Sequence, residues 1–251
     1  MYVTPSRTVH DAAVTVPGSK SYTHRVLIAA ALAPGQSVIL NALRSEDTAL
    51  TMGGLRQLGI AIADRPDGIT LQGLAGRLRP SEKPIYLGNS GTSMRLLISI
   101  AALGRGDYLL TGTPRMQERP VQALLDSLGQ LGVAARSAKD NGCPPIAVTG
   151  RVIEGGHVTI DCSLSSQFLS SLLLMAPLSR SGLVVDVSRG PVSKPYVDLT
   201  VDILQRFGVT VSRIGYQRFE VPGSQRYRAG TYEVEPDVSN ASYFWAAGAV
   251  S

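Results

Sequence analysis

The sequence predicts a mixed α/β fold made of three similar units, each containing strands and two helices. A helix end of the form Leu-x-x-Leu/Phe-Gly-Ile/Val recurs about every 75 residues, at 55–60, 128–133 and 204–209. Each copy is followed by alternating apolar residues and by a second strand that ends near a glycine, at 69–73, 146–150 and 219–223. Each is preceded by a strand, a polar turn and an apolar helix, at 13–32, 85–103 and 158–178. This matching order of elements predicts a repeat.

The glycine of each helix end, Gly59, Gly132 or Gly208, suits the left-handed residue that closes a helix. The alternating apolar residues after it are typical of half-buried strands. Each unit therefore ends in a helix followed by a hairpin.

Small polar residues precede the first helix of each unit, at 18–21, 88–92 and 163–166. Serine, threonine and asparagine are good N-caps, and a helix start leaves backbone N–H groups free. A second, more basic turn follows in each unit, at 44–47, 114–120 and 189–196. A fourth copy begins at Tyr232 and reaches only its first helix, so we expect the sequence to be truncated.

Composition narrows the class of protein. With 44% hydrophobic and 17% charged residues, the 251-residue chain can bury a sizeable core, and its apolar runs are too short to span a membrane. The net charge of +5 comes from scattered basic residues without interleaved aromatic ones, which argues against a nucleic-acid partner. Two cysteines form neither a disulfide framework nor a metal cluster, so we expect a cytoplasmic protein without a metal.

The polar turns predict an anion site if the three units pack around a pseudo-threefold axis, because their helix N-termini then converge on one face. The turns carry cations and hydroxyl donors: Lys20, Arg25, Arg95, Arg119 and Lys194, with Ser21, Thr92, Ser165, Ser166 and Ser193. His24 is open to two readings, a general base or a structural histidine. The glycine-rich stretch at Gly88 matches neither a P-loop nor a dinucleotide fingerprint.

At these turns the sequence resembles the enolpyruvyl transferases, and specifically the 5-enolpyruvylshikimate-3-phosphate synthase family, over nearly its whole length. The resembling segments are Pro-Gly-Ser-Lys-Ser with His-Arg at 17–25, Gly-Asn-Ser-Gly-Thr-Ser-Met-Arg at 88–95, Pro-Arg-Met-Gln-Glu-Arg-Pro at 114–120, Ser-Ser-Gln-Phe at 165–168, Val-Ser-Lys-Pro-Tyr at 192–196, and 237–244. Several such motifs in the right order are far more specific than any one.

The resemblance implies two lobes, each of three βαβαββ units around a pseudo-threefold axis, with the active site between them. Residues 14–229 would form the upper lobe, with units at about 14–80, 83–151 and 156–228. Residues 1–13 would be a strand of the lower lobe, and residues 230–251 would be its truncated start.

The resemblance also implies transfer of the enolpyruvyl group from phosphoenolpyruvate to the 5-hydroxyl of shikimate 3-phosphate, a shikimate-pathway step in aromatic amino acid biosynthesis that needs no cofactor and no metal. Shikimate 3-phosphate would contact Ser21, Arg25, Ser165, Ser166, Gln167, Ser193 and Tyr196. Phosphoenolpyruvate would contact Lys20, Asn89, Gly91, Thr92, Arg119 and Gln167, with Lys20 acting electrostatically. The acid and base carboxylates would come from the C-terminal half of the same enzyme, so we expect this chain to be inactive alone.

The sequence departs from the family pattern at Ser90 and Leu96, where alanine and proline are common. Two alternatives stay open, a related transferase that acts on UDP-N-acetylglucosamine and a non-catalytic anion-binding module. The motifs at 165–167 and 193–196 favour the shikimate substrate, and no cysteine lies between Arg115 and Arg119.

Overall fold

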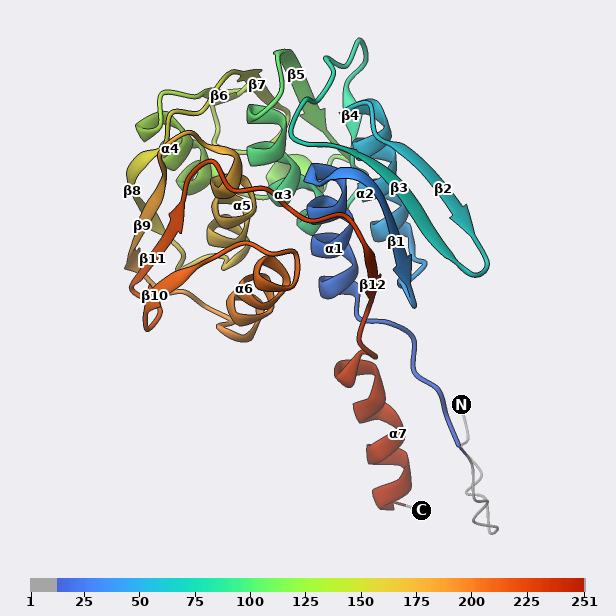
Figure 1. Cartoon of the computed structure of the whole chain (residues 1–251). Helices are drawn as coiled ribbons and strands as arrows, with labels where there is room; N and C mark the ends of the chain where they lie inside the picture. Colours follow the sequence, from blue (N-terminus) through green and yellow to red (C-terminus); the bar gives the residue numbers. More distant parts are fainter. Residues whose placement is uncertain (1–12, 251) are drawn as a thin grey trace.

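The computed structural model describes residues 13–250, which form one lobe with a final helix projecting from it (Figure 1). The strand expected at 1–13 lies, apart from Ala13, outside the described residues. Three four-stranded sheets surround the lobe's helices, and each sheet contains one parallel pair and two antiparallel pairs. This repetition confirms the predicted fold class.

The three sheets have the same strand order. The first contains β12 (Thr231–Glu233), β1 (Pro34–Leu40), β3 (Gly68–Leu74) and β2 (Ala61–Arg65). The second contains β4 (Ile85–Tyr86), β5 (Gly106–Thr111), β7 (Ile146–Gly150) and β6 (Ala134–Ser137). The third contains β8 (Gly156–Asp161), β9 (Gly182–Arg189), β11 (Arg218–Pro222) and β10 (Ser212–Ile214).

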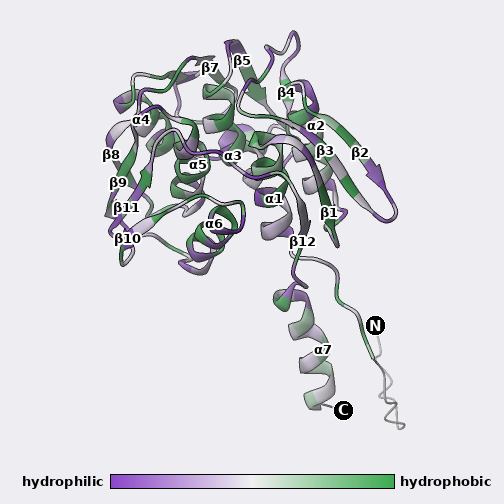
Figure 2. Cartoon of the chain, in the orientation of Figure 1, coloured by the Kyte–Doolittle hydropathy of each residue, from purple (hydrophilic) through white to green (hydrophobic). Residues whose placement is uncertain are grey.

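The first helices of the three units form the centre of the lobe: α1 (Lys20–Leu32), α3 (Gly91–Ala102) and α5 (Gln167–Met175). They are buried on all sides over long stretches, at 22–32, 96–102 and 168–175. A helix buried on all sides needs apolar or small residues around most of its circumference, and these stretches supply them, with His24 and Arg25 as the exceptions. Apolar residues recur in the helices and strands of the lobe (Figure 2).

The second helices lie further out: α2 (Glu46–Gln57), α4 (Gln122–Gln130) and α6 (Pro195–Arg206). Each ends in a Schellman motif, in which the glycine after the helix has positive φ, +94° at Gly59, +72° at Gly132 and +83° at Gly208. The following apolar residue donates its N–H to the leucine five positions earlier, at 3.0 Å for Ile60 and Val133 and 2.9 Å for Val209. The repeated sequence pattern is therefore this helix end. Two short 3₁₀ turns complete the helices, Met116–Glu118 and Ala176–Leu178.

The first unit differs from the expected order at one strand. Residues 13–19 contain no strand, only a bridge between Gly18 and Pro236. The corresponding edge of β1 is instead occupied by β12, which pairs with it in parallel from Thr231 to Glu233. A strand that the repeat assigned to the start of the next lobe thus completes the first sheet.

Helix α7 (Val238–Val250) is the first helix of the fourth copy of the repeat. The Asp237 carboxylate accepts a hydrogen bond from the N–H of Ser239 over 2.9 Å at its start. The helix stands away from the lobe, and Tyr243, Phe244 and Trp245 are 76%, 50% and 64% exposed. Among residues 13–250, no helix has the length and apolar character to cross a bilayer.

Candidate functional site

Two adjoining cavities lie where the first helices of the three units begin. The serine cavity, of about 310 Å³, is lined by Lys20, Ser21, Arg25, Thr92, Leu164, Ser165, Ser166, Gln167, Val192, Ser193 and Tyr196. The arginine cavity, of about 410 Å³, is lined by Lys20, Glu46, Asp47, Asn89, Gly91, Thr92, Arg95, Arg119 and Gln167. Lys20, Thr92 and Gln167 line both. Each of the twelve site residues predicted from the sequence therefore lies in one cavity or in both.

Loop and helix starts supply the polar groups of the serine cavity. Ser165 and Ser166 directly precede α5 and are almost fully buried. Ser165 caps this helix through its Oγ, which accepts from the N–H of Gln167 over 3.2 Å, whereas Ser166 makes no side-chain cap bond. Ser193, just before α6, has a left-handed backbone at φ +54°, a conformation that costs free energy for a non-glycine residue and is found at functional sites.

Arg25 is a buried cation without an acidic partner. Its Nε donates to the Thr200 hydroxyl over 2.7 Å, and its two other nitrogens donate to the Ser21 carbonyl at 2.8 Å and the Ser170 hydroxyl at 3.1 Å. None of the ion pairs in the described chain includes Arg25. Burial lowers the pKa of Arg25 to about 10, so it stays charged at neutral pH. A buried uncompensated cation favours an anionic ligand.

The arginine cavity holds two guanidinium groups close to the start of α3. A Cβ placed on Gly91 would lie 2.6 Å from Nη1 of Arg119 and 3.8 Å from Nη1 of Arg95. Burial, and then the charge of Arg119, lower the pKa of Arg95. Two like charges beside a helix N-terminus form an electropositive site for a carboxylate or a phosphate.

Gln167 joins the two cavities. Its Oε1 accepts from Arg95 over 3.0 Å, and its Nε2 donates to the hydroxyl of Thr92 over 3.0 Å. These two bonds fix the orientation of the amide and link α5 to α3. Gln167 can therefore present polar atoms to ligands in both cavities.

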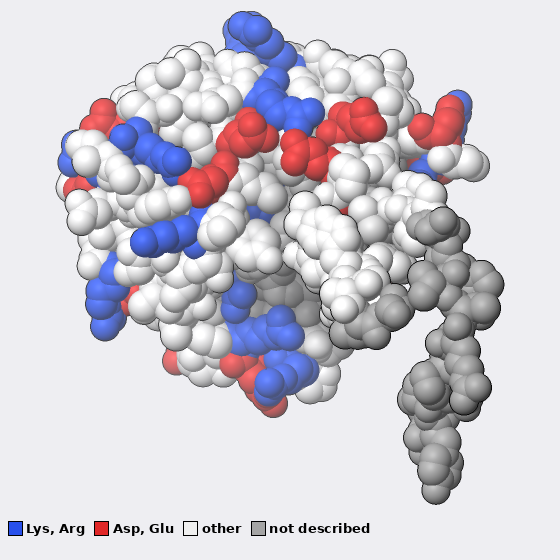
Figure 3. Space-filling model, turned by 90° about the horizontal axis from the view of Figure 1, so that it is seen from below, with Lys and Arg blue, Asp and Glu red and all other residues white. Residues whose placement is uncertain are grey.

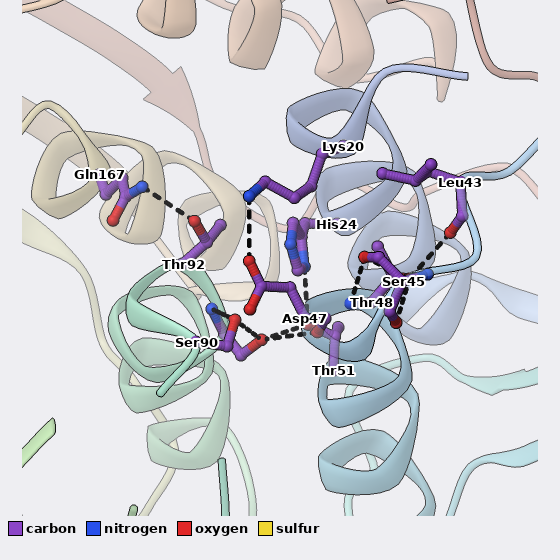
Figure 4. A network of polar contacts seen from close by, with 11 residues as sticks. Lys20, His24, Leu43, Ser45, Asp47, Thr48, Thr51, Ser90, Thr92 and Gln167 are labelled. Carbon is purple, nitrogen blue, oxygen red and sulfur yellow. Dashed lines mark hydrogen bonds and ion pairs between the residues drawn. The ribbon is translucent and has the colours of Figure 1, made fainter. Parts of the chain in front are cut away.

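Lys20, at the start of α1, pairs with Asp47 at the start of α2, with 3.0 Å between Nζ and Oδ2 (Figure 4). Both side chains are partly exposed, so the pair contributes at most about 1 kcal/mol to folding. The pair matters more for ligand binding than for folding, because the Asp47 carboxylate competes with an anionic ligand for Lys20.

Sequence reasoning missed Glu46 and Asp47, since acidic residues in a first helix turn have an ordinary explanation in the helix dipole. Arg95 was predicted only as a source of positive charge, and the structure places it in the arginine cavity. Lys194 lines neither cavity. Its Nζ lies instead over the ring of Tyr216, 5.1 Å from the ring centre. His24 is fully buried and lines neither cavity, which favours a structural role for it over that of a general base.

Charge on the face seen in Figure 3 is mixed, with acidic side chains among the basic ones. No continuous basic surface of the kind that tracks a nucleic-acid backbone appears in that view. Within residues 13–250, no cluster of three or more histidine, cysteine or acidic side chains is arranged to hold a metal.

Comparisons with known proteins agree with the fold and the motifs. The family model described as EPSP synthase (3-phosphoshikimate 1-carboxyvinyltransferase) matches residues 5–251. The 3-phosphoshikimate 1-carboxyvinyltransferase of Shewanella amazonensis is 44% identical over 241 residues, covering 94% of this chain and 56% of that protein. The same-named protein of Methanosphaerula palustris is 48% identical over 242 residues, covering 95% and 57%.

A solved structure of EPSP synthase from Acinetobacter baumannii superposes with a TM-score of 0.82 at 28% identity, covering 92% of this chain and 51% of that one. The chain thus spans a little over half the length of the curated relatives it matches.

Proposed function

The chain belongs to the EPSP synthase (3-phosphoshikimate 1-carboxyvinyltransferase) family, and on this premise we propose that its two cavities bind shikimate 3-phosphate and part of phosphoenolpyruvate. The proposed reaction transfers the enolpyruvyl group of phosphoenolpyruvate to the 5-hydroxyl of shikimate 3-phosphate. One observation carries the proposal: twelve residues chosen from five separate sequence motifs line two cavities that share Lys20, Thr92 and Gln167.

We assign shikimate 3-phosphate to the serine cavity. The hydroxyls of Ser21, Ser165, Ser166 and Ser193 can bond to phosphate oxygens and to ring hydroxyls. Arg25 supplies a buried positive charge that the protein leaves uncompensated. Tyr196, at the first turn of α6, forms another wall of the cavity.

We assign phosphoenolpyruvate to the arginine cavity. This ligand carries a phosphate and a carboxylate, and the cavity offers Arg95, Arg119 and Lys20 with the free N–H groups at the start of α3. Lys20, Thr92 and Gln167, which line both cavities, mark where the two ligands would meet. The reaction requires the ligands to meet, because it forms a bond between them. Asn89 and Thr92 add polar contacts on the same side.

The chemistry explains what these residues would do. Protonating the methylene carbon of phosphoenolpyruvate creates a cationic centre at C2, which the 5-hydroxyl attacks as it loses its proton. The tetrahedral product then expels inorganic phosphate, and its new methyl group loses a proton to a base, which re-forms the carbon–carbon double bond of the enolpyruvyl group. Lys20 and the arginines would hold the negative phosphate as it leaves, and Gln167 would orient both ligands. The acid and the base are proposed to come from a second lobe, and no cofactor is needed for these steps.

We propose that residues 230–251 begin that second lobe and that the C-terminal half of the enzyme is the partner of this chain. The exposed aromatic side chains of α7 offer a surface for such packing. Strand β12 would then belong to the connection, since it pairs with β1. A cytoplasmic location stays a prediction, consistent with free cysteines at 143 and 162.

Calorimetric titration tests the proposal directly. Shikimate 3-phosphate should bind, and phosphoenolpyruvate should bind more tightly once it is present. UDP-N-acetylglucosamine should give no heat at the same concentrations. Binding of the UDP-sugar in place of shikimate 3-phosphate would overturn the assignment, and a phosphate-release assay with the C-terminal half added would separate an enzyme from an anion-binding module.

A further inference from the structure

A chain of hydrogen-bonded side chains joins α1, α2 and the start of α3 (Figure 4). Nδ1 of His24 lies 2.7 Å from Oγ1 of Thr51, which lies 2.7 Å from Oγ of Ser93. Oγ of Ser93 lies 2.7 Å from Oγ of Ser90 and 3.2 Å from the backbone carbonyl oxygen of Asp47. The four side chains are almost fully buried, so water does not compete for these contacts.

The carbonyl of Asp47 fixes the direction of every bond in the chain, because it can only accept. If Ser93 donates its one hydroxyl proton to that carbonyl, its two lone pairs accept from Ser90 and Thr51. Thr51 has then used its proton and must accept from His24. Only this arrangement turns all four short contacts into hydrogen bonds, and it places the ring proton of neutral His24 on Nδ1.

The other ring nitrogen of His24 agrees with this tautomer. Nε2 is the one buried side-chain nitrogen or oxygen of the described residues that has no hydrogen-bond partner. In the Nδ1–H tautomer Nε2 carries no proton, so the ring has no buried N–H group left without an acceptor. Asp47, Arg25 and Lys20 are the charged groups that act on the ring.

The chain connects groups that the arginine cavity needs in fixed positions. His24 lies one turn after Lys20 on α1, Thr51 lies one turn after Asp47 on α2, and Ser93 lies in the turn of α3 that begins at Gly91. Ser90 also caps α3, because its Oγ accepts from the N–H of Ser93 over 3.4 Å. Alanine at residue 90 could not make this bond.

We propose that His24 is a positioning residue for the arginine cavity, acting through Thr51 and Ser93 on the start of α3. It touches no ligand. The hydrogen bond that Nδ1–H of His24 donates sets the direction of the hydrogen bonds between these side chains. Together these bonds hold the N-terminus of α3 against α2. For phosphoenolpyruvate as the ligand, the inference rests on the proposed function.

The first test needs no ligand. Long-range ¹H–¹⁵N spectra of the full chain at neutral pH report which nitrogen of a histidine ring carries the proton. We expect the Nδ1–H tautomer for His24, identified by the loss of its signals in His24→Asn. An Nε2–H tautomer would overturn the inference, because His24 could then only accept from Thr51.

The second test compares substitutions that keep or remove the donor. In His24→Asn the side-chain amide can donate from nearly the position of Nδ1, whereas His24→Leu removes the donor. We expect His24→Leu to weaken phosphoenolpyruvate binding about fivefold, the factor given by one lost neutral hydrogen bond, and His24→Asn to restore most of it. Faster amide exchange at Ser93 should accompany the loss.

Ser179→Ala is the matched control, since it removes a buried hydroxyl that donates to the Ala176 carbonyl over 2.7 Å and lines neither cavity. It should lower the melting temperature without weakening phosphoenolpyruvate binding. Equal binding by His24→Leu and the unaltered chain would overturn the positioning role. If phosphoenolpyruvate bound none of the proteins, the proposed function would fail, and the tautomer and the amide exchange of Ser93 would still decide the inference.

Discussion

Nη1 of Arg119 occupies the space in which a side chain at residue 91 would begin, 2.6 Å from an ideal Cβ on Gly91. This approach brings a guanidinium to the free N–H groups at the start of α3. Glycine at residue 91 is therefore a requirement of the cavity and not of the backbone, since Gly91 is an ordinary helical residue.

Gly91→Ala should weaken phosphoenolpyruvate binding while leaving the fold intact. The added methyl group must displace the end of Arg119, a flexible side chain, so the cost falls on the position of the charge. We expect a loss of about tenfold, within the range for a charge-assisted bond, measured by calorimetry. Shikimate 3-phosphate binding should change little, because neither residue lines the serine cavity. An equal loss for both ligands would contradict this reading.

Arg25→Ala and Ser166→Ala should both weaken shikimate 3-phosphate binding. Each removes a donor from the serine cavity, and bonds to a charged ligand contribute about 1.5 to 3 kcal/mol. Ser166→Ala is the cleaner variant, because Ser166 makes no side-chain cap bond that the substitution would remove. Arg25→Lys tests whether charge alone suffices. Unchanged affinity in both alanine variants would remove the phosphate-site assignment.

Asp47→Asn should strengthen phosphoenolpyruvate binding, because it removes the carboxylate that competes for Lys20. We expect an effect of up to about 1 kcal/mol at low salt that shrinks as ionic strength rises. The matched control is Asp64→Asn, which breaks the pair of Asp64 with Arg44 at nearly the same exposure but away from both cavities. Weaker binding in Asp47→Asn would show that the pair positions Lys20 more than it neutralises it.

The local elements of the fold could be predicted from the sequence because they depend on near neighbours. The Leu-x-x-Leu-Gly-Val pattern at 128–133 is a Schellman motif whichever sheet follows it. The pairing of β12 with β1 could not be predicted, since nothing in residues 231–233 specifies an edge almost 200 positions earlier in the chain.

The site shows the same division. The hydroxyl and basic residues of the turns were predictable, because each lies at a helix start where an anion is favoured. The hydrogen-bond chain from His24 to Ser90 was not, because Thr51 and Ser93 look like ordinary small residues inside amphipathic helices. The burial of Arg25 without a carboxylate likewise depends on Ser170 and Thr200, far along the chain.

Alanine substitutions at two glycines near the end of α4 should change the stability of the protein in opposite directions, because only one of the two glycines is the C-cap glycine of the Schellman motif. Gly132→Ala should destabilise the protein by about 1 kcal/mol, because a residue with a Cβ is strained at a φ of +72°. The nearest atom to the new Cβ would lie at an ordinary 3.5 Å, so no steric clash adds to this cost. Gly129→Ala, inside α4 with open space around its Cβ, should stabilise by about 0.5 to 1 kcal/mol. Urea unfolding of both variants measures the difference, and equal signs would contradict the role of the C-cap.

The stability of the folded chain should depend on pH through His24. Burial lowers the pKa of His24 from 6.5 to about 4, while Asp47 raises it and Arg25 and Lys20 lower it further. Between these two values the unfolded chain binds a proton that the folded chain does not, so stability falls as pH drops from about 6.5 to about 4. Above pH 6.5 the contribution is complete.

Urea unfolding from pH 7 to pH 4 measures this contribution when the unaltered chain is compared with His24→Asn. The unaltered chain should lose up to about 3 kcal/mol more than the variant over this interval, the free energy that corresponds to the shift. The carboxyls of Asp161, Asp186 and Asp198, whose pKa values lie below the usual 3.8, lose their contributions only at lower pH. Parallel curves for the two proteins would mean that His24 takes up its proton in the folded chain as readily as in the unfolded one.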